Sequence, residues 1–281
     1  MKKSKGMRLA FVLLGSLIAD ISSASSEAVE RSKDPFPYEL DSRTDIAIGA
    51  IGTAAAGVAI GLSFTVDDVK ESEINSLDRN SINAIDRTAI GNWSEGSSTA
   101  SHVTLGISTA LPVGVLISQA IDRRWKNTLT LFVMYAEAMA MNIVINTIFK
   151  AALQRKRPYL YDENISLETK LAESDSNESF YSAHASMSFC AAVFAVKIFS
   201  DIHPESEWRY TVWPTALALA STTGFLRYTA GKHFPTDIVI GAAVGGLVGY
   251  VVPLLHTKHG LVISLYPIRR DYTGLGASIR F

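Results

Sequence analysis

Six long apolar stretches constrain the fold of this chain more than any other feature. They run from Asp45 to Val66, His102 to Ile121, Thr128 to Phe149, Ala183 to Phe199, Thr211 to Leu226 and Ile238 to Leu255. A helix that crosses a bilayer needs about 17–25 mostly apolar residues, and several stretches reach that length. The chain is also 48% hydrophobic and only 19% charged, which is more apolar than an average soluble domain. We expect an all-α, multi-pass membrane bundle of about six helices. A soluble helical protein is the alternative, because the fourth and fifth stretches are short.

Small residues recur within these stretches at helical spacing. Gly241, Gly245 and Gly249 occupy every fourth position of the last stretch, and Gly57 and Gly61 share that spacing in the first. Glycines four residues apart lie on one face of a helix, where they let a second helix approach closely. We therefore expect close helix contacts at both places.

The N-terminus is typical of a secretory signal peptide. Basic residues from Lys2 to Arg8 precede an apolar run from Leu9 to Ala19, and small residues follow as far as Ser26. We interpret residues 1–26 as a signal peptide cleaved near residues 24–28, or as an uncleaved N-terminal anchor.

The C-terminus changes period. Apolar residues alternate with their neighbours at Leu261, Ile263 and Leu265, and again from Leu275 to Phe281. Alternation on both sides of a short polar segment indicates a β-hairpin. The expected organisation is therefore a helical domain over residues 40–256 and a β-hairpin tail over residues 257–281.

Charge and cysteine content exclude some classes of function. The net charge of −1 gives no general argument for a nucleic-acid partner, and the single cysteine, Cys190, cannot form an intrachain disulfide. Arg123, Arg124 and Lys126 favour a cytoplasmic connection between the second and third stretches, so the third helix would end at the outer face. A cleaved signal peptide would leave the start of the mature chain outside. If every stretch then crosses the membrane, the third helix ends inside, which conflicts with the expectation from the basic residues.

Two polar segments separate the apolar stretches. Residues 67–101 contain a small echo, in which Leu77-Asp78-Arg79 is followed by Ile85-Asp86-Arg87. It predicts either helix capping with local ion pairs or short amphipathic turns on the membrane surface. Residues 159–181 are acidic and join two of the clusters described next, so they should border the site or form a solvated loop.

A basic cluster ends the third stretch. Lys150 and Arg157 are seven residues apart, which is two helical turns, and Pro158 follows. If the helix continues, both cations point toward the same ligand. A basic helix end that complements the helix dipole is the alternative interpretation.

A second cluster, Ser182-Ala183-His184, lies at the start of the fourth apolar stretch. The serine hydroxyl and the free backbone N–H groups of a helix N-terminus can bind an anion, and the imidazole of His184 can donate a proton. The alternative interpretation is a serine that only caps the helix, beside a histidine that has no role in the site.

The third cluster joins Arg227, His233 and Asp237, with Pro235 at the start of the last helix. From the first turn Asp237 can reach back to His233, fix its tautomer and leave the other ring nitrogen as a nucleophile. A metal site formed by His184, His233 and Asp237 is the competing interpretation. We favour a phosphate site over it, because Lys150, Arg157 and Arg227 would repel a divalent ion and attract a phosphate.

The order Lys150-x6-Arg157-Pro158, Ser182-Ala183-His184, Arg227-x5-His233-x3-Asp237 resembles the three-part motif of the type 2 phosphatidic acid phosphatase superfamily. That superfamily includes lipid phosphatases, class A acid phosphatases and vanadium haloperoxidases. The resemblance covers roughly Asp45 to His256. It implies a phosphoric ester hydrolase in which His233 forms a phosphohistidine and Asp237 orients it, while His184 protonates the leaving oxygen and later activates water.

The same resemblance implies a phosphate cradle that needs no metal or other cofactor. Its members would be Lys150, Arg157, Ser182, Ala183 and Arg227. One position departs from the family pattern, because Ala183 stands where glycine is usual. If that glycine is needed for a positive φ or a close backbone approach, alanine would loosen the cradle.

The resulting hypothesis is a membrane phosphatase acting on a lipid phosphomonoester or pyrophosphate. The resemblance suggests phosphatidic acid, phosphatidylglycerophosphate, undecaprenyl pyrophosphate and lipid A as substrates. It also suggests a bacterial-type cell envelope, with the protein in the inner membrane and its site facing the periplasm. A vanadate-dependent haloperoxidase and a catalytically silent envelope protein are the alternatives.

Overall fold

The computed structural model describes residues 36–258, 262–269 and 273–280. The expected signal peptide or anchor, residues 1–26, lies outside this part of the chain. The chain divides into the units Met1–Pro37 and Tyr38–Phe281. The boundaries expected at residues 26, 40 and 257 stay predictions.

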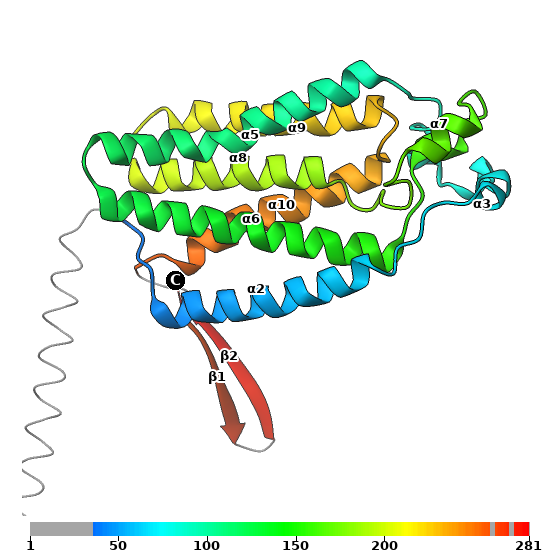
Figure 1. Ribbon diagram of the computed structural model, residues 1–281. Coiled ribbons are helices and arrows are strands. Elements are labelled where there is room, and N and C mark those ends of the chain that lie inside the picture. The colour runs from blue at the N-terminus through cyan, green and yellow to red at the C-terminus, as the bar shows by residue number, and fades with distance from the viewer. Residues whose placement is uncertain (1–35, 259–261, 270–272, 281) are drawn as a thin grey trace, which may run out of the picture. The chain divides into compact units, whose positions relative to one another are not determined.

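All six apolar stretches are helices, each longer or shifted by a few residues relative to the expectation (Figure 1). They are α2 (Ser42–Ser63), α5 (Glu95–Ile121), α6 (Trp125–Leu153), α8 (Ala183–Ile202), α9 (Arg209–Thr229) and α10 (Pro235–Leu255). Five of them are long and apolar enough to cross a membrane by length and composition. The exception is α9, which carries the polar run Ser221-Thr222-Thr223. The expected all-helical bundle is therefore confirmed, with five candidate membrane spans in the described part instead of six.

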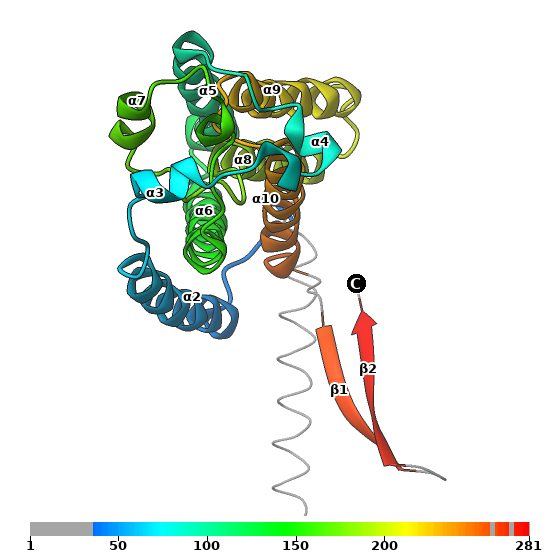
Figure 2. The same cartoon turned by 90° about the vertical axis from the view of Figure 1, so that its right-hand side faces the viewer.

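Helix α8 lies in the middle of α5, α6, α9 and α10 (Figure 2). Its apolar residues are buried on most sides, whereas α2 packs on α6 and leaves side chains such as Ile46 and Ile51 exposed. Small residues make the α8–α9 contact, where Ala192 and Ala220 are fully buried. Most of the apolar surface of the outer helices thus remains available to lipid.

The contact between α8 and α10 depends on glycine. A Cβ atom at Gly245 would lie 1.9 Å from the carbonyl oxygen of Ser186, and one at Gly249 would lie 2.3 Å from that of Cys190. The close approach expected for the last stretch is therefore present. The one expected for the first stretch is not, since a Cβ atom at Gly57 or Gly61 would have no neighbour within 4 Å.

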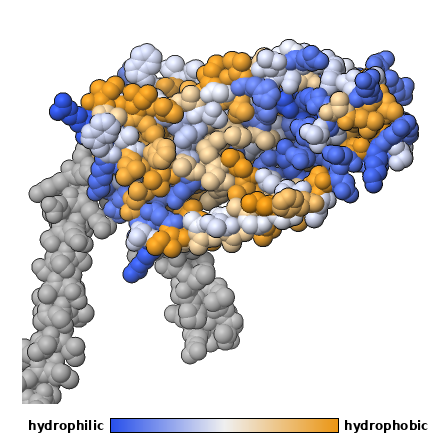
Figure 3. Space-filling model, in the orientation of Figure 1, coloured by the Kyte–Doolittle hydropathy of each residue, from blue (hydrophilic) through white to orange (hydrophobic). Residues whose placement is uncertain are grey.

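Short helices cover one end of the bundle (Figure 2). They are α3 (Glu71–Asn75), η1 (Arg79–Ser81), α4 (Ala84–Arg87), η2 (Pro158–Tyr161) and α7 (Leu167–Ala172). The Asp78 side chain caps η1 and that of Asn83 caps α4, as the capping interpretation of the echo predicts. Hydrophilic residues gather toward this end, and hydrophobic ones cover much of the flank of the bundle (Figure 3).

Two strands follow α10, β1 (Val262–Arg269) and β2 (Thr273–Arg280). They pair antiparallel, with Val262 opposite Arg280. The connecting residues 270–272 lie outside the described residues, so the hairpin as a unit stays a prediction.

Candidate active site

The three clusters meet at the end of the bundle that the short helices cover. Lys150 lies in the last turn of α6 and Arg227 in the last turn of α9, while Ser182 caps α8 and Asp237 lies in the first turn of α10. Helices α6 and α9 end here, whereas α8 and α10 begin here, so C-terminal cations face N-terminal backbone N–H groups. This arrangement concentrates positive potential at one place.

His233 lies in the connection between α9 and α10 and is almost completely buried. Its Nδ1 is 2.7 Å from the backbone carbonyl oxygen of Ser179. Because a carbonyl oxygen only accepts, Nδ1 carries the proton and Nε2 keeps its lone pair. Burial lowers the pKa of His233 well below its usual value, and the positive charges of Arg157, Arg227 and Lys150 lower it further. The ring is therefore a neutral imidazole whose Nε2 lone pair is free.

Asp237 does not hold His233 directly, contrary to the expectation from the sequence. Its Oδ2 is 3.9 Å from His233 Nδ1, which is too far for a hydrogen bond. Oδ2 instead accepts from the Ser179 hydroxyl at 2.6 Å and from the Phe234 N–H at 3.0 Å. The reason is that the Ser179 carbonyl already occupies Nδ1, so Asp237 positions the histidine through Ser179.

Arg155 completes this network and was not singled out from the sequence. Its guanidinium donates to Asp237 Oδ1 and, at 2.8 Å, to Asp86 Oδ2. Asp86 is fully buried and also accepts from the backbone N–H and hydroxyl of Thr236. Burial alone would raise the pKa of Asp86, but the hydrogen bonds from Arg155 and Thr236 outweigh it and lower the pKa. Besides its local caps, the repeated segment thus makes a long-range contact, through Asp86, with the start of α10.

The predicted phosphate-binding cations differ in how fully they are paired. Arg157 is buried and donates to the carbonyl oxygens of Asp175 and Lys232 and to the Asp175 carboxylate. Arg227 is also buried, yet within the described part of the chain only its NH1 group has partners, the hydroxyls of Ser98 and Ser101 at 3.3 and 3.4 Å. Its Nε is buried without a hydrogen-bond partner. An unpaired buried guanidinium nitrogen is costly, and an anion would satisfy it.

The acidic segment borders the site, as expected. Lys150 Nζ is 3.4 Å from Glu178, and Lys232 Nζ is 2.6 Å from Glu173. Together with Asp175 on Arg157, these carboxylates partly neutralise the cations. An incoming phosphate would compete with them for the same donors.

His184 lies in the first turn of α8, where its Nε2 is 3.1 Å from Nδ1 of His102 on α5. The two rings meet edge to face with centroids 4.7 Å apart. Sequence reasoning missed His102, since a lone histidine 82 positions away carries no motif. The contact gives His184 a partner that can exchange a proton with it.

Ser182 and Ala183 have structural explanations as well. The Ser182 hydroxyl accepts from the Ala185 N–H at 3.4 Å, so it caps α8, and its own N–H donates to the Asp237 carbonyl oxygen. Ala183 is the first residue of α8. Among the described non-glycine residues only Arg123 and Gln154 have a positive φ, so Ala183 does not need the conformation that glycine favours.

A cavity of about 290 Å³ opens beside these groups. Its wall includes His102, which contacts His184, and Ser98, which contacts Arg227. Lys232 lines it too, with Nζ over the rings of Trp93 and Tyr159. The cavity is therefore large enough for a phosphate-bearing head group, and it is bordered by residues that contact His184 and Arg227.

Comparison with known proteins supports the motif-based interpretation. Residues 131–261 match the family model of the PAP2 superfamily and include all three clusters. A lipid A 1-phosphatase from Rhizobium etli is 29% identical over 125 residues, which cover 44% of this chain and 50% of that protein. The matched region thus spans about half of the curated relative's length.

Among solved structures, the chain is similar to the crystal structure of a transmembrane PAP2-type phosphatidylglycerolphosphate phosphatase from Bacillus subtilis. The TM-score is 0.46 at 18% sequence identity, covering 74% of this chain and 94% of that one. The family match agrees with the family suggested by the three clusters: residues 131–261 of this chain are similar to the PAP2 superfamily.

Proposed function

We propose that this protein is a membrane lipid phosphatase that hydrolyses a lipid phosphomonoester or pyrophosphate through a phosphohistidine, without a metal at the phosphate site. The observation that carries the proposal is the surrounding of His233. The charges of Arg157, Arg227 and Lys150 all act on its buried, neutral ring, and the Arg227 Nε next to the site has no partner.

In the first step, Nε2 of His233 attacks phosphorus while the bond from phosphorus to the lipid oxygen breaks. His184 donates a proton to that leaving oxygen. The Ser179 carbonyl accepts from Nδ1 throughout and so supports the positive charge that develops on the ring. Arg157, Arg227 and Lys150 hold the non-bridging oxygens, where the charge of the transferring group is spread.

In the second step, water attacks the phosphohistidine and the phosphorus–nitrogen bond breaks. His184, now neutral, takes the proton from that water, and inorganic phosphate leaves. His102 lies between His184 and the cavity and gives this proton a route to solvent. Asp237 contributes by fixing Ser179, and through it the tautomer of His233.

The basic residues Arg123, Arg124 and Lys126 support an outward-facing site. We place it in the inner membrane of a bacterial-type envelope with the site facing the periplasm. The curated relative is named as a lipid A 1-phosphatase, so lipid A leads the list of substrates, followed by phosphatidylglycerophosphate, phosphatidic acid and undecaprenyl pyrophosphate.

The test is phosphate release from this panel of lipids by purified protein in EDTA. We expect release by the wild type and a loss of at least about a thousandfold in His233→Gln, because the nucleophile is gone. His203→Gln is the matched control, since His203 is exposed at the other end of α8 and should leave the rate unchanged. Release that survives His233→Gln would overturn the mechanism, and no release from any lipid would overturn the function.

A further inference from the structure

His256, which follows α10, has a ring whose orientation is fixed. The residue is 2% exposed, and its Nδ1 is 2.8 Å from the carbonyl oxygen of Val252. Because the carbonyl can only accept, Nδ1 carries a proton. Nε2 is therefore the ring nitrogen that is available to a second partner.

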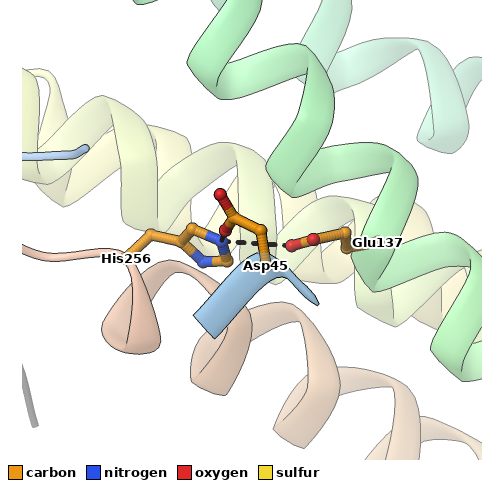
Figure 4. Close-up of side chains that lie close together, drawn as sticks. All are labelled: Asp45, Glu137 and His256. Carbon is orange, nitrogen blue, oxygen red and sulfur yellow. Dashed lines mark hydrogen bonds and ion pairs between the residues drawn. The ribbon is translucent and has the colours of Figure 1, made fainter. Parts of the chain in front are cut away.

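Nε2 of His256 faces two carboxylates from two other helices (Figure 4). Asp45 Oδ1 on α2 and Glu137 Oε2 on α6 each lie 3.1 Å from it. The three ligand atoms lie within 4.8 Å of one another. The hydrogen-bond geometry of Nε2 is satisfied only toward Asp45, and Glu137 Oε2 is buried without a hydrogen-bond partner.

One proton cannot satisfy this arrangement. If Nε2 carries no proton, three lone pairs face one another. If it carries one, the N–H serves Asp45 and leaves the buried Glu137 oxygen unpaired, which costs free energy. A divalent cation between the three atoms would satisfy all of them at once and would balance the two negative charges.

We propose that Asp45, Glu137 and His256 bind a divalent cation of the zinc class. Zinc takes histidine nitrogen and carboxylate oxygen at about 2.0–2.2 Å, so neighbouring ligands of a tetrahedral ion lie roughly 3.3–3.5 Å apart. The observed 3.1 Å separations reach that spacing with a shift of a few tenths of an ångström. The Nδ1 contact with a backbone carbonyl is the outer partner that a metal-binding histidine normally has. Water would complete the coordination.

This site is separate from the proposed phosphatase site. The 21 residues of α10 place His256 about 30 Å from the start of that helix, where Asp237 lies. The metal would tie α2, which packs on α6 and is otherwise largely exposed, to α6 and to the end of α10. Its role is thus structural, and the proposal does not depend on phosphatase activity.

The test measures zinc content and the thermal unfolding midpoint of full-length protein, purified in detergent without a histidine tag. Protein stripped with a chelator and dialysed against Zn²⁺ should retain one equivalent per chain and unfold at a higher temperature. Glu137→Gln keeps the shape of the side chain and should lose both the bound equivalent and the zinc-dependent shift. His256→Gln should do the same, and His203→Gln should behave as the wild type.

Two results would overturn the proposal. The first is a wild-type protein that retains no zinc after dialysis, which would leave the cluster as a protonated histidine with two carboxylates. The second is zinc binding that persists in a folded Glu137→Gln or His256→Gln variant, which would place the metal elsewhere. A single elution peak in size-exclusion chromatography confirms that each variant is folded.

Discussion

His233 combines burial with three neighbouring cations, so folding keeps its imidazole neutral. The unfolded chain has no such restriction, and there the ring binds a proton with its usual pKa of 6.5. Above that pH the ring is neutral in both states and makes no difference to the free energy of unfolding. Below it, only the unfolded state gains a proton, so stability falls as the pH falls toward the lowered pKa of the folded state.

His233→Gln should remove this acid sensitivity. In the wild type the penalty grows by up to about 1.4 kcal/mol per pH unit below 6.5, whereas the variant has no proton to take up at this position. The thermal unfolding midpoints of both proteins, measured in detergent from neutral to mildly acidic pH, should diverge in favour of the variant as the pH falls. Parallel curves would contradict a neutral buried ring.

At the residue scale, the sequence predicts reactive groups better than their partners. His233, His184 and Arg227 can be identified from the sequence because their residue types and their spacing indicate phosphate chemistry. The group that fixes His233 is a backbone carbonyl, that of Ser179, and a carbonyl has no sequence signal. Arg155 had a weak signal, since it is a further cation just before Arg157, but its pairing with Asp86 is set by the tertiary fold.

At the element scale, α8 and α10 position the site together because both begin there. Ser182 and His184 open α8, and Asp237 lies in the first turn of α10. The distance between the two helices is set by glycines of α10 that touch the α8 backbone. A change in that distance would therefore displace the proposed catalytic groups relative to one another.

Gly245→Ala tests this coupling. Its Cβ would lie 1.9 Å from the Ser186 carbonyl oxygen, so the helices must separate, at a cost of about 1–3 kcal/mol or more. We expect a lower unfolding midpoint and slower phosphate release. Gly246→Ala is the control one position away, where the nearest atom is Val193 Cγ2 at an ordinary 3.7 Å. Equal behaviour of the two variants would show that the α8–α10 contact does not set the site.

Element prediction succeeded where a long apolar run decides the outcome. All six stretches are helices, since buried or lipid-facing runs of this length must satisfy their backbone groups internally. The short helices α3, α4 and α7 have too few residues for a periodic pattern. Their positions over the site depend on contacts such as Asp86 with Thr236, which local sequence does not encode.

At the scale of the whole molecule, the helix directions fix which parts share a membrane face. The site lies where α6 ends and α10 begins. Asp45, at the start of α2, lies beside His256 at the end of α10, and the Glu39 N–H donates to the His256 carbonyl oxygen. The chain around residues 38–45 therefore lies at the end of the bundle away from the site.

This arrangement sharpens the conflict seen in the sequence. The two expectations would agree if the first apolar stretch did not cross the membrane, yet that stretch forms α2, which is among the candidate spans. If the site faces outward, residues 38–45 lie inside, and a cleaved signal peptide would have placed them outside. An outward-facing site thus predicts that the N-terminal segment is retained and stays on the inner side.

Cysteine labelling in intact cells with a membrane-impermeant maleimide decides the orientation. Glu163→Cys lies on the site side and Arg124→Cys in the connection between α5 and α6; both positions are exposed, whereas the native Cys190 is buried. Because Arg123, Arg124 and Lys126 favour the cytoplasm, we expect labelling at position 163 in intact cells and at position 124 only after permeabilisation. The reverse pattern would place the site inside and agree with a cleaved signal peptide. The mass of the purified protein should then be that of the cleaved chain, whereas the expected pattern goes with the mass of the full-length chain.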